Sequence, residues 1–170
     1  GDTFTRIDDM AFTLAPDAGG AGYEELVREL AEAELAPDRI LHSWLLTWDR
    51  SHRPGSSLFH RNQNHGFYSL FYLARSLSRV ESARDWPVHI IVLANGIHRV
   101  GDERTEYPEK ATVIGPCSVI PRELPAISCS LVDLDRLPPS DRRVVRSERT
   151  DRDVPHEQRG ADAGFVPRRR

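Results

Sequence analysis

The sequence predicts an α/β fold in which helices pack on a mostly parallel sheet. Ile40–Trp48 and Val88–Ala94 are near-continuous apolar runs of strand length, typical of strands that are buried on both faces of a parallel sheet. Segments with helical periodicity lie between the predicted strands, so that strands and helices alternate along the chain. The length of 170 residues suits one domain of ordinary size. A nucleotide-binding, Rossmann-type sandwich is the default member of this class.

The first elements are a short strand and an amphipathic helix. Met10–Ala15 precedes Pro16 and suits a brief strand closed by a turn, and a glycine-rich loop follows over Asp17–Gly22. The next segment repeats apolar residues at the spacing of a helix with one buried face, before Pro37 ends the element. These apolar residues are Tyr23, Leu26, Val27 and Leu30.

The middle of the chain predicts a buried strand, a long helix and a second buried strand. After the strand at Ile40–Trp48, the polar residues of Asp49–Ser57 predict a loop. Leu58–Val80 carries apolar residues at helical spacing, so we expect a long helix there. The strand at Val88–Ala94 ends in the turn-forming pair Asn95-Gly96.

A third helix and an edge strand complete the predicted fold. Lys110–Glu123 predicts a helix that Pro116 and Pro121 would kink or end. Ile127–Asp135 alternates apolar residues with serines, which suits a strand at a sheet edge. The predicted order is therefore β-α-β-α-β-α-β, with right-handed crossovers.

Charge divides the chain into two parts. Residues 1–135 carry 13 basic and 20 acidic side chains, whereas residues 136–170 carry 10 basic and 6 acidic ones. The second part is also rich in proline and poor in large apolar residues, so it would bury little surface to offset its ordering entropy. We expect a folded domain over 1–135 and a disordered arginine-rich tail over 136–170. A tail that binds an acidic partner is the alternative.

Composition excludes several classes of protein. No apolar run is long enough for a membrane span and no charged-then-apolar leader opens the sequence, so we expect a soluble, cytoplasmic or already processed chain without a membrane partner. The net charge of -3 gives no reason to expect a nucleic-acid partner. The two cysteines, Cys117 and Cys129, cannot by themselves form a disulfide framework or a four-ligand zinc site.

The nucleotide-binding motifs of this fold class are missing. The glycines of Gly19-Gly20-Ala21-Gly22 do not match G-x-G-x-x-G, so a loop is a better interpretation than a phosphate cradle. Lys110, the only lysine, follows Glu109, which excludes a P-loop. A reductase dyad of tyrosine and lysine four residues apart is also excluded, because position 106 is Glu106 and Tyr107 is separated from Lys110 by Pro108. We therefore expect no bound cofactor.

The other reactive side chains suggest structural roles. Cys117 lies among apolar residues and resembles a small buried hydrophobe more than a nucleophile. His60 and His65 are five apart on one helix, which places them on different faces and argues against a metal pair. His42 and His89 lie in apolar strands, as hydrogen-bonded core histidines do, and termination of a strand explains Asp133 and Asp135. No catalytic, cofactor-binding or metal-binding residue is predicted.

One long motif is more specific. YPEKATVIGPCSVIPRELP (107–125), followed by ISCSLVDLD (127–135), resembles the PEKAT-x-x-GPC-x-VIP-x-E-x-P segment in the structural subdomain of ketoreductase domains of modular type I polyketide synthases. HIIVLANGIHRVGDE (89–103), ILHSWLLT (40–47) and the helix around Gly66–Leu70 are similar to further segments of that subdomain. The resemblance runs from about Phe4 to Asp135.

The resemblance implies a role without catalysis. In that family one half of the ketoreductase binds NADPH and carries the catalytic residues, while the structural half is a truncated Rossmann-like sandwich, related to short-chain dehydrogenases, that lacks a cofactor site and braces the active half. The chain is therefore expected to support NADPH-dependent reduction of β-ketoacyl thioesters on acyl carrier protein, with the catalytic subdomain and other synthase domains as partners. Two alternatives stay open: a free-standing small-molecule enzyme that uses Cys117 or the loop 95–106, and an interaction module that acts through its basic tail.

Overall fold

The computed structural model describes residues 3–47, 56–80, 87–98 and 107–134. Its centre is a three-stranded parallel sheet of order β3-β4-β5. The strands are β3 (Arg39–Leu45), β4 (Val88–Ala94) and β5 (Ile127–Asp133). The strand β5 pairs with β4 alone among the described strands, which confirms the predicted edge strand.

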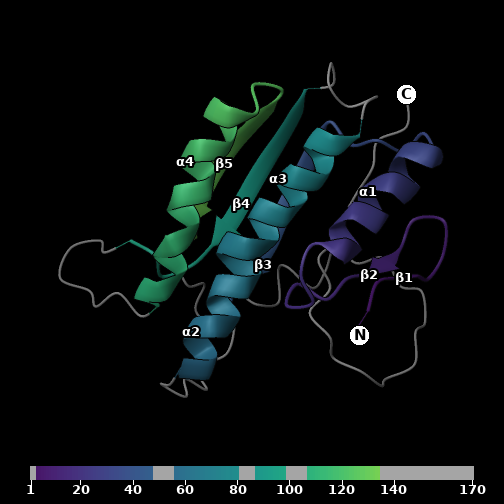
Figure 1. Ribbon diagram of the computed structural model, residues 1–170. Coiled ribbons are helices and arrows are strands. Elements are labelled where there is room, and N and C mark those ends of the chain that lie inside the picture. The colour runs from purple at the N-terminus through teal and green to yellow at the C-terminus, as the bar shows by residue number, and fades with distance from the viewer. Residues whose placement is uncertain (1–2, 48–55, 81–86, 99–106, 135–170) are drawn as a thin grey trace, which may run out of the picture.

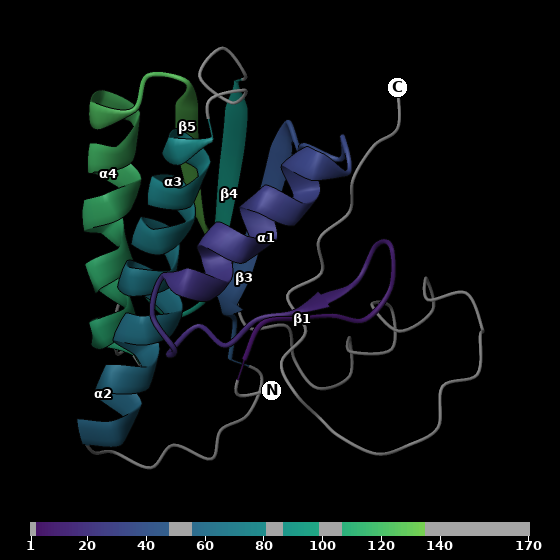
Figure 2. The ribbon, with the colours of Figure 1, turned by 45° about the vertical axis from the view of Figure 1, so that its right-hand side comes forward.

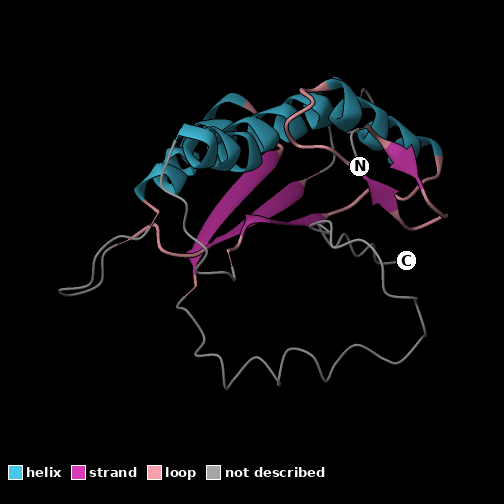
Figure 3. Cartoon of the chain, turned by 90° about the horizontal axis from the view of Figure 1, so that it is seen from below, coloured by secondary structure: helices cyan, strands magenta, loops and turns pink. Residues whose placement is uncertain are grey.

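The described helices all lie on one face of this sheet, as the view in Figure 3 shows. They are α1 (Ala21–Glu32), α2 (Ser56–Gln63), α3 (Ser69–Arg79) and α4 (Ile114–Glu123), with a π-helical turn η1 (Asn64–Tyr68) and a 3₁₀ helix η3 (Pro108–Val113). In Figures 1 and 2, α3 and α4 run side by side over the sheet, and α1 lies beside α3. This arrangement is the predicted truncated Rossmann-like α/β fold.

The core forms where the helical and strand periodicities meet. The strand β4 alternates buried residues on its helix-covered face with half-buried ones on the other, and α3 buries residues at i, i+3, i+4 and i+7 spacing. Each valine, leucine or isoleucine among them contributes about 1.5–3 kcal/mol when it is removed from water. The buried apolar residues of these two elements are Val88, Ile90, Val92, Ala94, Leu70, Leu73, Ala74 and Leu77.

Three expectations about the elements need correction. The predicted first strand is only β2 (Phe12–Thr13), and it pairs antiparallel with β1 (Thr5–Arg6) in a separate hairpin rather than in the parallel sheet. The apolar strands are not buried on both faces in the described structure: Leu41 is 46% exposed, because the described helices cover only the opposite face. Pro121 lies inside α4 and the helix ends two residues later, as expected, but Pro116 does not interrupt it.

The position of Pro116 explains why it is tolerated. It is the third residue of α4, a position whose backbone N–H would have no partner within the helix, so the N–H that proline lacks is not needed there. The predicted helix at Leu58–Val80 begins at Ser56, ends at Arg79 and contains the π-helical turn η1. The tail 136–170, Asp135, most of the loop after Trp48 and the loop beyond His98 lie outside the described residues.

Candidate functional site

Ligands of open α/β sheets bind at the carboxyl ends of the strands, so the search for a site begins there. The ends of β3 and β4 are joined by Asn95, which is 4% exposed. Its Nδ2 donates to the carbonyl O of Thr47 at 2.8 Å, and its Oδ1 accepts from the Thr47 backbone N at 3.0 Å. Gly96 follows with φ of 71°, a conformation that favours glycine.

Lys110 fills the space next to this junction. Its side chain is 0% exposed, and its Nζ donates to Asn95 Oδ1 at 2.7 Å and to the Asn95 carbonyl O at 3.1 Å. The same nitrogen lies 4.2 Å from the centroid of the Tyr107 ring, at cation–π distance. A buried cation is costly unless such groups replace its water, and here carbonyl oxygens and a ring face do so.

The remaining polar side chains at this edge also bond to one another. Asp133 Oδ2 accepts from the backbone N of His98 at 2.7 Å and lies 3.1 Å from the Nδ1 of the same residue. Asn62 Nδ2 donates to Glu109 Oε1 at 2.7 Å, which connects α2 to η3. In the described part of this edge, where this fold class binds ligands, these polar side chains thus contact other groups of the chain.

The Tyr107–Lys110 pair does not have the geometry of a reductase dyad. The ammonium faces the ring, and both side chains are buried, with Tyr107 3% exposed. A catalytic dyad needs the phenol and the ammonium at a surface that substrate and cofactor reach. The observed contact is therefore a packing interaction within the motif 107–125.

The glycine-rich loop serves packing as well. A Cβ at Gly22 would lie 2.8 Å from Leu14 Cδ1, and a Cβ at Gly20 would lie 3.0 Å from Tyr72 Cδ1. These two glycines allow the start of α1 to approach Leu14 and Tyr72 closely. Their close contacts are with the chain itself, and the predicted loop Asp17–Gly22 is shorter in the structure, because Ala21 and Gly22 already belong to α1.

The two cysteines lack the properties of a nucleophile. Burial raises the pKa of the Cys117 thiol to about 12 and that of Cys129 to about 11. Both groups therefore remain protonated near neutral pH, and both pack against the core. This result supports the structural interpretation of Cys117 and weighs against the enzyme alternative that depends on it.

A buried serine–histidine pair escaped the sequence analysis. His42 Nε2 lies 2.6 Å from Ser69 Oγ, and Ser69 Oγ donates to the His65 carbonyl O at 2.6 Å. Since a hydroxyl has one hydrogen, His42 donates to Ser69. The Nδ1 of His42 is buried and has no hydrogen-bond partner among the described residues. The side chains are 3% and 0% exposed, so no substrate reaches them. They form a core contact between β3 and the start of α3.

The other predicted histidines have separate partners. His89 lies on the face of the sheet opposite the helices, with Nδ1 2.7 Å from Ser128 Oγ and Nε2 3.1 Å from Ser130 Oγ. His65 packs edge-on against Trp44 at 5.5 Å between ring centroids. Within the part of the chain that the structure describes, no three His, Cys, Asp or Glu side chains gather as a metal site requires.

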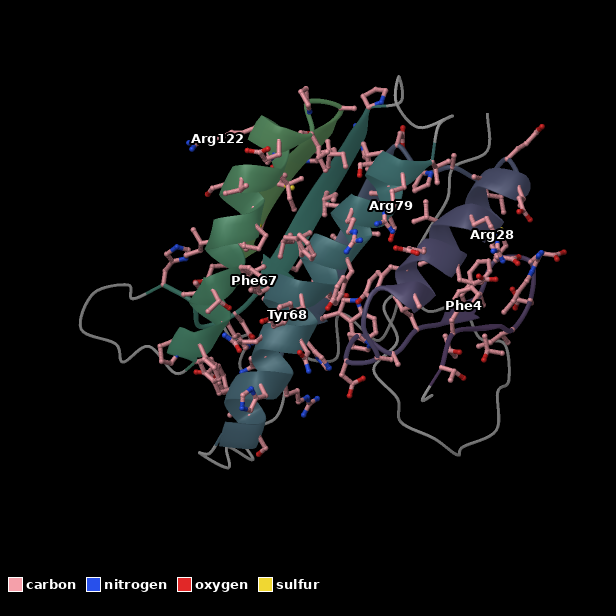
Figure 4. The ribbon with its side chains drawn as sticks, in the orientation of Figure 1. Phe4, Arg28, Phe67, Tyr68, Arg79 and Arg122 are labelled. Carbon is pink, nitrogen blue, oxygen red and sulfur yellow. The ribbon has the colours of Figure 1, made fainter. Side chains whose placement is uncertain are left out.

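Apolar side chains remain exposed on the outer face of the helical layer. Phe67 lies close to Gly115, since a Cβ added to this glycine would be 3.9 Å from the Phe67 ring. One helical turn further along the chain, Phe71 follows Phe67 in α3, and Val119 follows Gly115 in α4. Phe71 is 43% and Val119 49% exposed, and the ring of Tyr68, 41% exposed, lies beside that of Phe67. Figure 4 shows Phe67 and Tyr68 on this outer side. We call these five residues the α3/α4 surface.

Exposed aromatic and aliphatic groups that adjoin one another are characteristic of interaction sites. Aromatic residues are enriched at protein interfaces, and the α3/α4 surface holds three of them.

Among the described helices, none has both the length and the apolar character that crossing a membrane requires.

Comparisons with known proteins agree with this architecture. A family model described as beta-ketoacyl synthase-like, N-terminal, matches residues 1–147. A solved adenylation, ketoreductase and pseudo Asub multidomain structure of a keto acid-selecting NRPS module has a similar fold, with a TM-score of 0.70 and 22% sequence identity over 78% of this chain. The present chain spans 11% of the length of that one. No curated protein sequence matches. These findings bear out the predicted fold and resemblance.

Proposed function

The chain belongs to the beta-ketoacyl synthase-like, N-terminal family, and from this membership we propose that it is the noncatalytic scaffold half of a polyketide synthase ketoreductase. Its partner is the catalytic half, which reduces β-ketoacyl thioesters on acyl carrier protein with NADPH. The solved neighbour is a multidomain module that includes a ketoreductase, which supports a role among other synthase domains. The chain itself supplies no catalytic group and holds no cofactor.

One observation carries the proposal: the carboxyl edge of the sheet is filled from within. Lys110 and Asn95, 0% and 4% exposed, occupy the region where a catalytic relative of this fold class would place its ligand. These two side chains fill space that a binding site would need. A domain of this kind contributes by fixing the position of its partner, since a misplacement of about 1 Å can cost on the order of 10²-fold in rate.

The α3/α4 surface is where we propose that the catalytic half binds. It is apolar and aromatic, and the helices beneath it pack against the core through buried residues such as Leu70 and Ile120. By contrast, the exposed apolar side chain Ile7 (65%) belongs to the short β1–β2 hairpin. This residue therefore serves as a matched control for substitutions in the surface.

An activity assay tests the role. The chain is incubated with NADPH and a β-ketoacyl thioester mimic, alone and together with a separately expressed catalytic half. We expect no turnover by the chain alone and an increase in the activity of the catalytic half upon mixing. Turnover by the chain alone would disprove the scaffold role.

Substitutions then test the surface. Phe71→Asp should weaken binding of the catalytic half by about 10-fold or more, because it places a charge in the centre of an apolar contact. Ile7→Asp should leave the affinity unchanged. Equal affinities for the wild-type chain and Phe71→Asp would place the contact elsewhere.

A further inference from the structure

Lys110 combines two properties that call for an explanation: it is the only lysine among 170 residues, and its side chain is 0% exposed. A lysine is rarely buried, since its ammonium loses its water. Among the contacts that offset this cost are two hydrogen bonds to Asn95 and the Tyr107 ring. The chain thus keeps its single lysine at a buried position, where the contacts of the ammonium replace water.

The contacts of this ammonium reach three elements. Asn95 Oδ1 accepts from both Lys110 Nζ and the backbone N of Thr47, so the ammonium is connected to the ends of β3 and β4. Lys110 itself belongs to η3, which lies against α2 and η1. Through Lys110, η3 is therefore fixed to the carboxyl edge of the sheet.

The position of α4 follows from that of η3. The helix α4 begins at Ile114, directly after the last residue of η3, and Val113 at this junction is 0% exposed. A shift of η3 would move the first turn of α4, where Gly115 approaches Phe67 of η1. The distance between the two sides of the α3/α4 surface therefore depends on how η3 is held.

We propose that Lys110 is a positioning residue: its ammonium, held by Asn95 and Tyr107, sets α4 beside α3 and so shapes the α3/α4 surface. The last step, recognition of this surface by the catalytic half, rests on the proposed function. The first step concerns the chain alone and is tested without a partner.

Hydrogen exchange of the chain alone provides that test. Lys110→Met keeps most of the side-chain length but removes the charge, and Arg122→Met removes a charge from an exposed position in α4. Lys110→Met should accelerate exchange in η3 and the first turn of α4 by about 10- to 100-fold, the loss expected for hydrogen bonds from a charged donor, while α1 is less affected. Arg122→Met should change neither. Unaltered exchange in Lys110→Met would overturn the proposal.

Chemical rescue covers the case in which Lys110→Met does not fold. Lys110→Ala removes a group of the size and charge of n-propylammonium. This ion, added to the solution, should therefore bind in the vacated space and raise the midpoint of thermal unfolding of Lys110→Ala. The midpoint should be higher than with 1-propanol at the same concentration, which has the same length but no charge. The wild-type chain is the control. Equal effects of the ion and the alcohol would show that the charge is not required, and would overturn the proposal.

Assays with the catalytic half separate the two claims. If the wild-type chain activates the catalytic half, the Lys110→Met chain should bind that half with lower affinity. Once the catalytic half is saturated with the chain, its KM for the thioester should be the same with the variant as with the wild type. Equal affinities would overturn the positioning role while the proposed function stands. If the wild-type chain does not activate, the proposed function fails, and the exchange and rescue results alone decide the role of Lys110.

Discussion

His42 should make the stability of the domain depend on pH. Its imidazole is 3% exposed, and burial lowers its pKa from 6.5 to about 4. The unfolded chain therefore binds a proton more readily than the folded chain between these values. Stability from this group is complete above pH 6.5 and is lost as the pH falls toward 4. At pH 5 the loss relative to pH 7 is about 2 kcal/mol, from 1.36 kcal/mol per pKa unit.

Urea unfolding measures this effect. His42→Gln is the reference, because an amide can still donate to Ser69 but does not titrate between pH 4 and 7. Between pH 7 and 5, the wild-type chain should lose about 2 kcal/mol more free energy of unfolding than His42→Gln, a large share of the 5–15 kcal/mol typical of a domain. The pKa of His65 is also lowered by burial, but this contribution is common to both proteins. Equal losses would refute the assignment of a buried neutral imidazole.

Three further predictions concern glycines and thiols. Gly22→Ala should lower the free energy of unfolding, because a Cβ 2.8 Å from Leu14 Cδ1 costs about 1–3 kcal/mol, more than the gain of about 0.5–1 kcal/mol in helix propensity. Gly115→Ala should raise the free energy of unfolding by about 0.5–1 kcal/mol through helix propensity, because the nearest atom to the added Cβ is 3.9 Å away. Thermal melts of both variants measure these effects, and midpoints that shift in the same direction would contradict the two predictions. Cys117 and Cys129, with their raised pKa values, should react with an aromatic disulfide reagent far more slowly in the native chain than in urea; equal rates would show that the thiols are accessible.

Local patterns predicted the regular elements well. In α1 the apolar spacing identified the buried face, which Tyr23, Val27 and Leu30 form in the structure. The run at Val88–Ala94 is β4 with the same boundaries as predicted. Both elements are encoded by residues next to one another in sequence, so periodicity alone is sufficient to find them.

The features that were missed depend on contacts between distant residues. The hairpin β1–β2 requires pairing of Thr5 with Thr13, which no local pattern in this sequence marked. At the turn η1, a Cβ on Gly66 would lie 2.9 Å from Leu45 Cδ1, so the close approach of the helix to β3 involves a residue 21 positions away. The apolar spacing of a helix shows which of its own faces is buried, but not on which side of the sheet the helix packs. The sequence therefore did not reveal that, in the described structure, helices cover β3 and β4 on one face only.

The candidate site illustrates the same limit. The missing glycine fingerprint and the unsuitable spacing around Lys110 could be established from the sequence, and they predicted a domain without a cofactor. The burial of Lys110 against Asn95 could not, since the two residues are 15 positions apart and meet only when η3 folds over the end of β4. The turn pair Asn95-Gly96 was noted, but the side-chain role of Asn95 was not.

The central claim is that this chain supports a separate catalytic half. The most direct measurement is the rate of NADPH oxidation by the isolated catalytic half, with a β-ketoacyl thioester mimic, as the chain is titrated in. We predict a rate that rises and saturates with the concentration of the chain, and no oxidation by the chain alone. A rate that does not depend on the chain, or oxidation by the chain without its partner, would contradict the account.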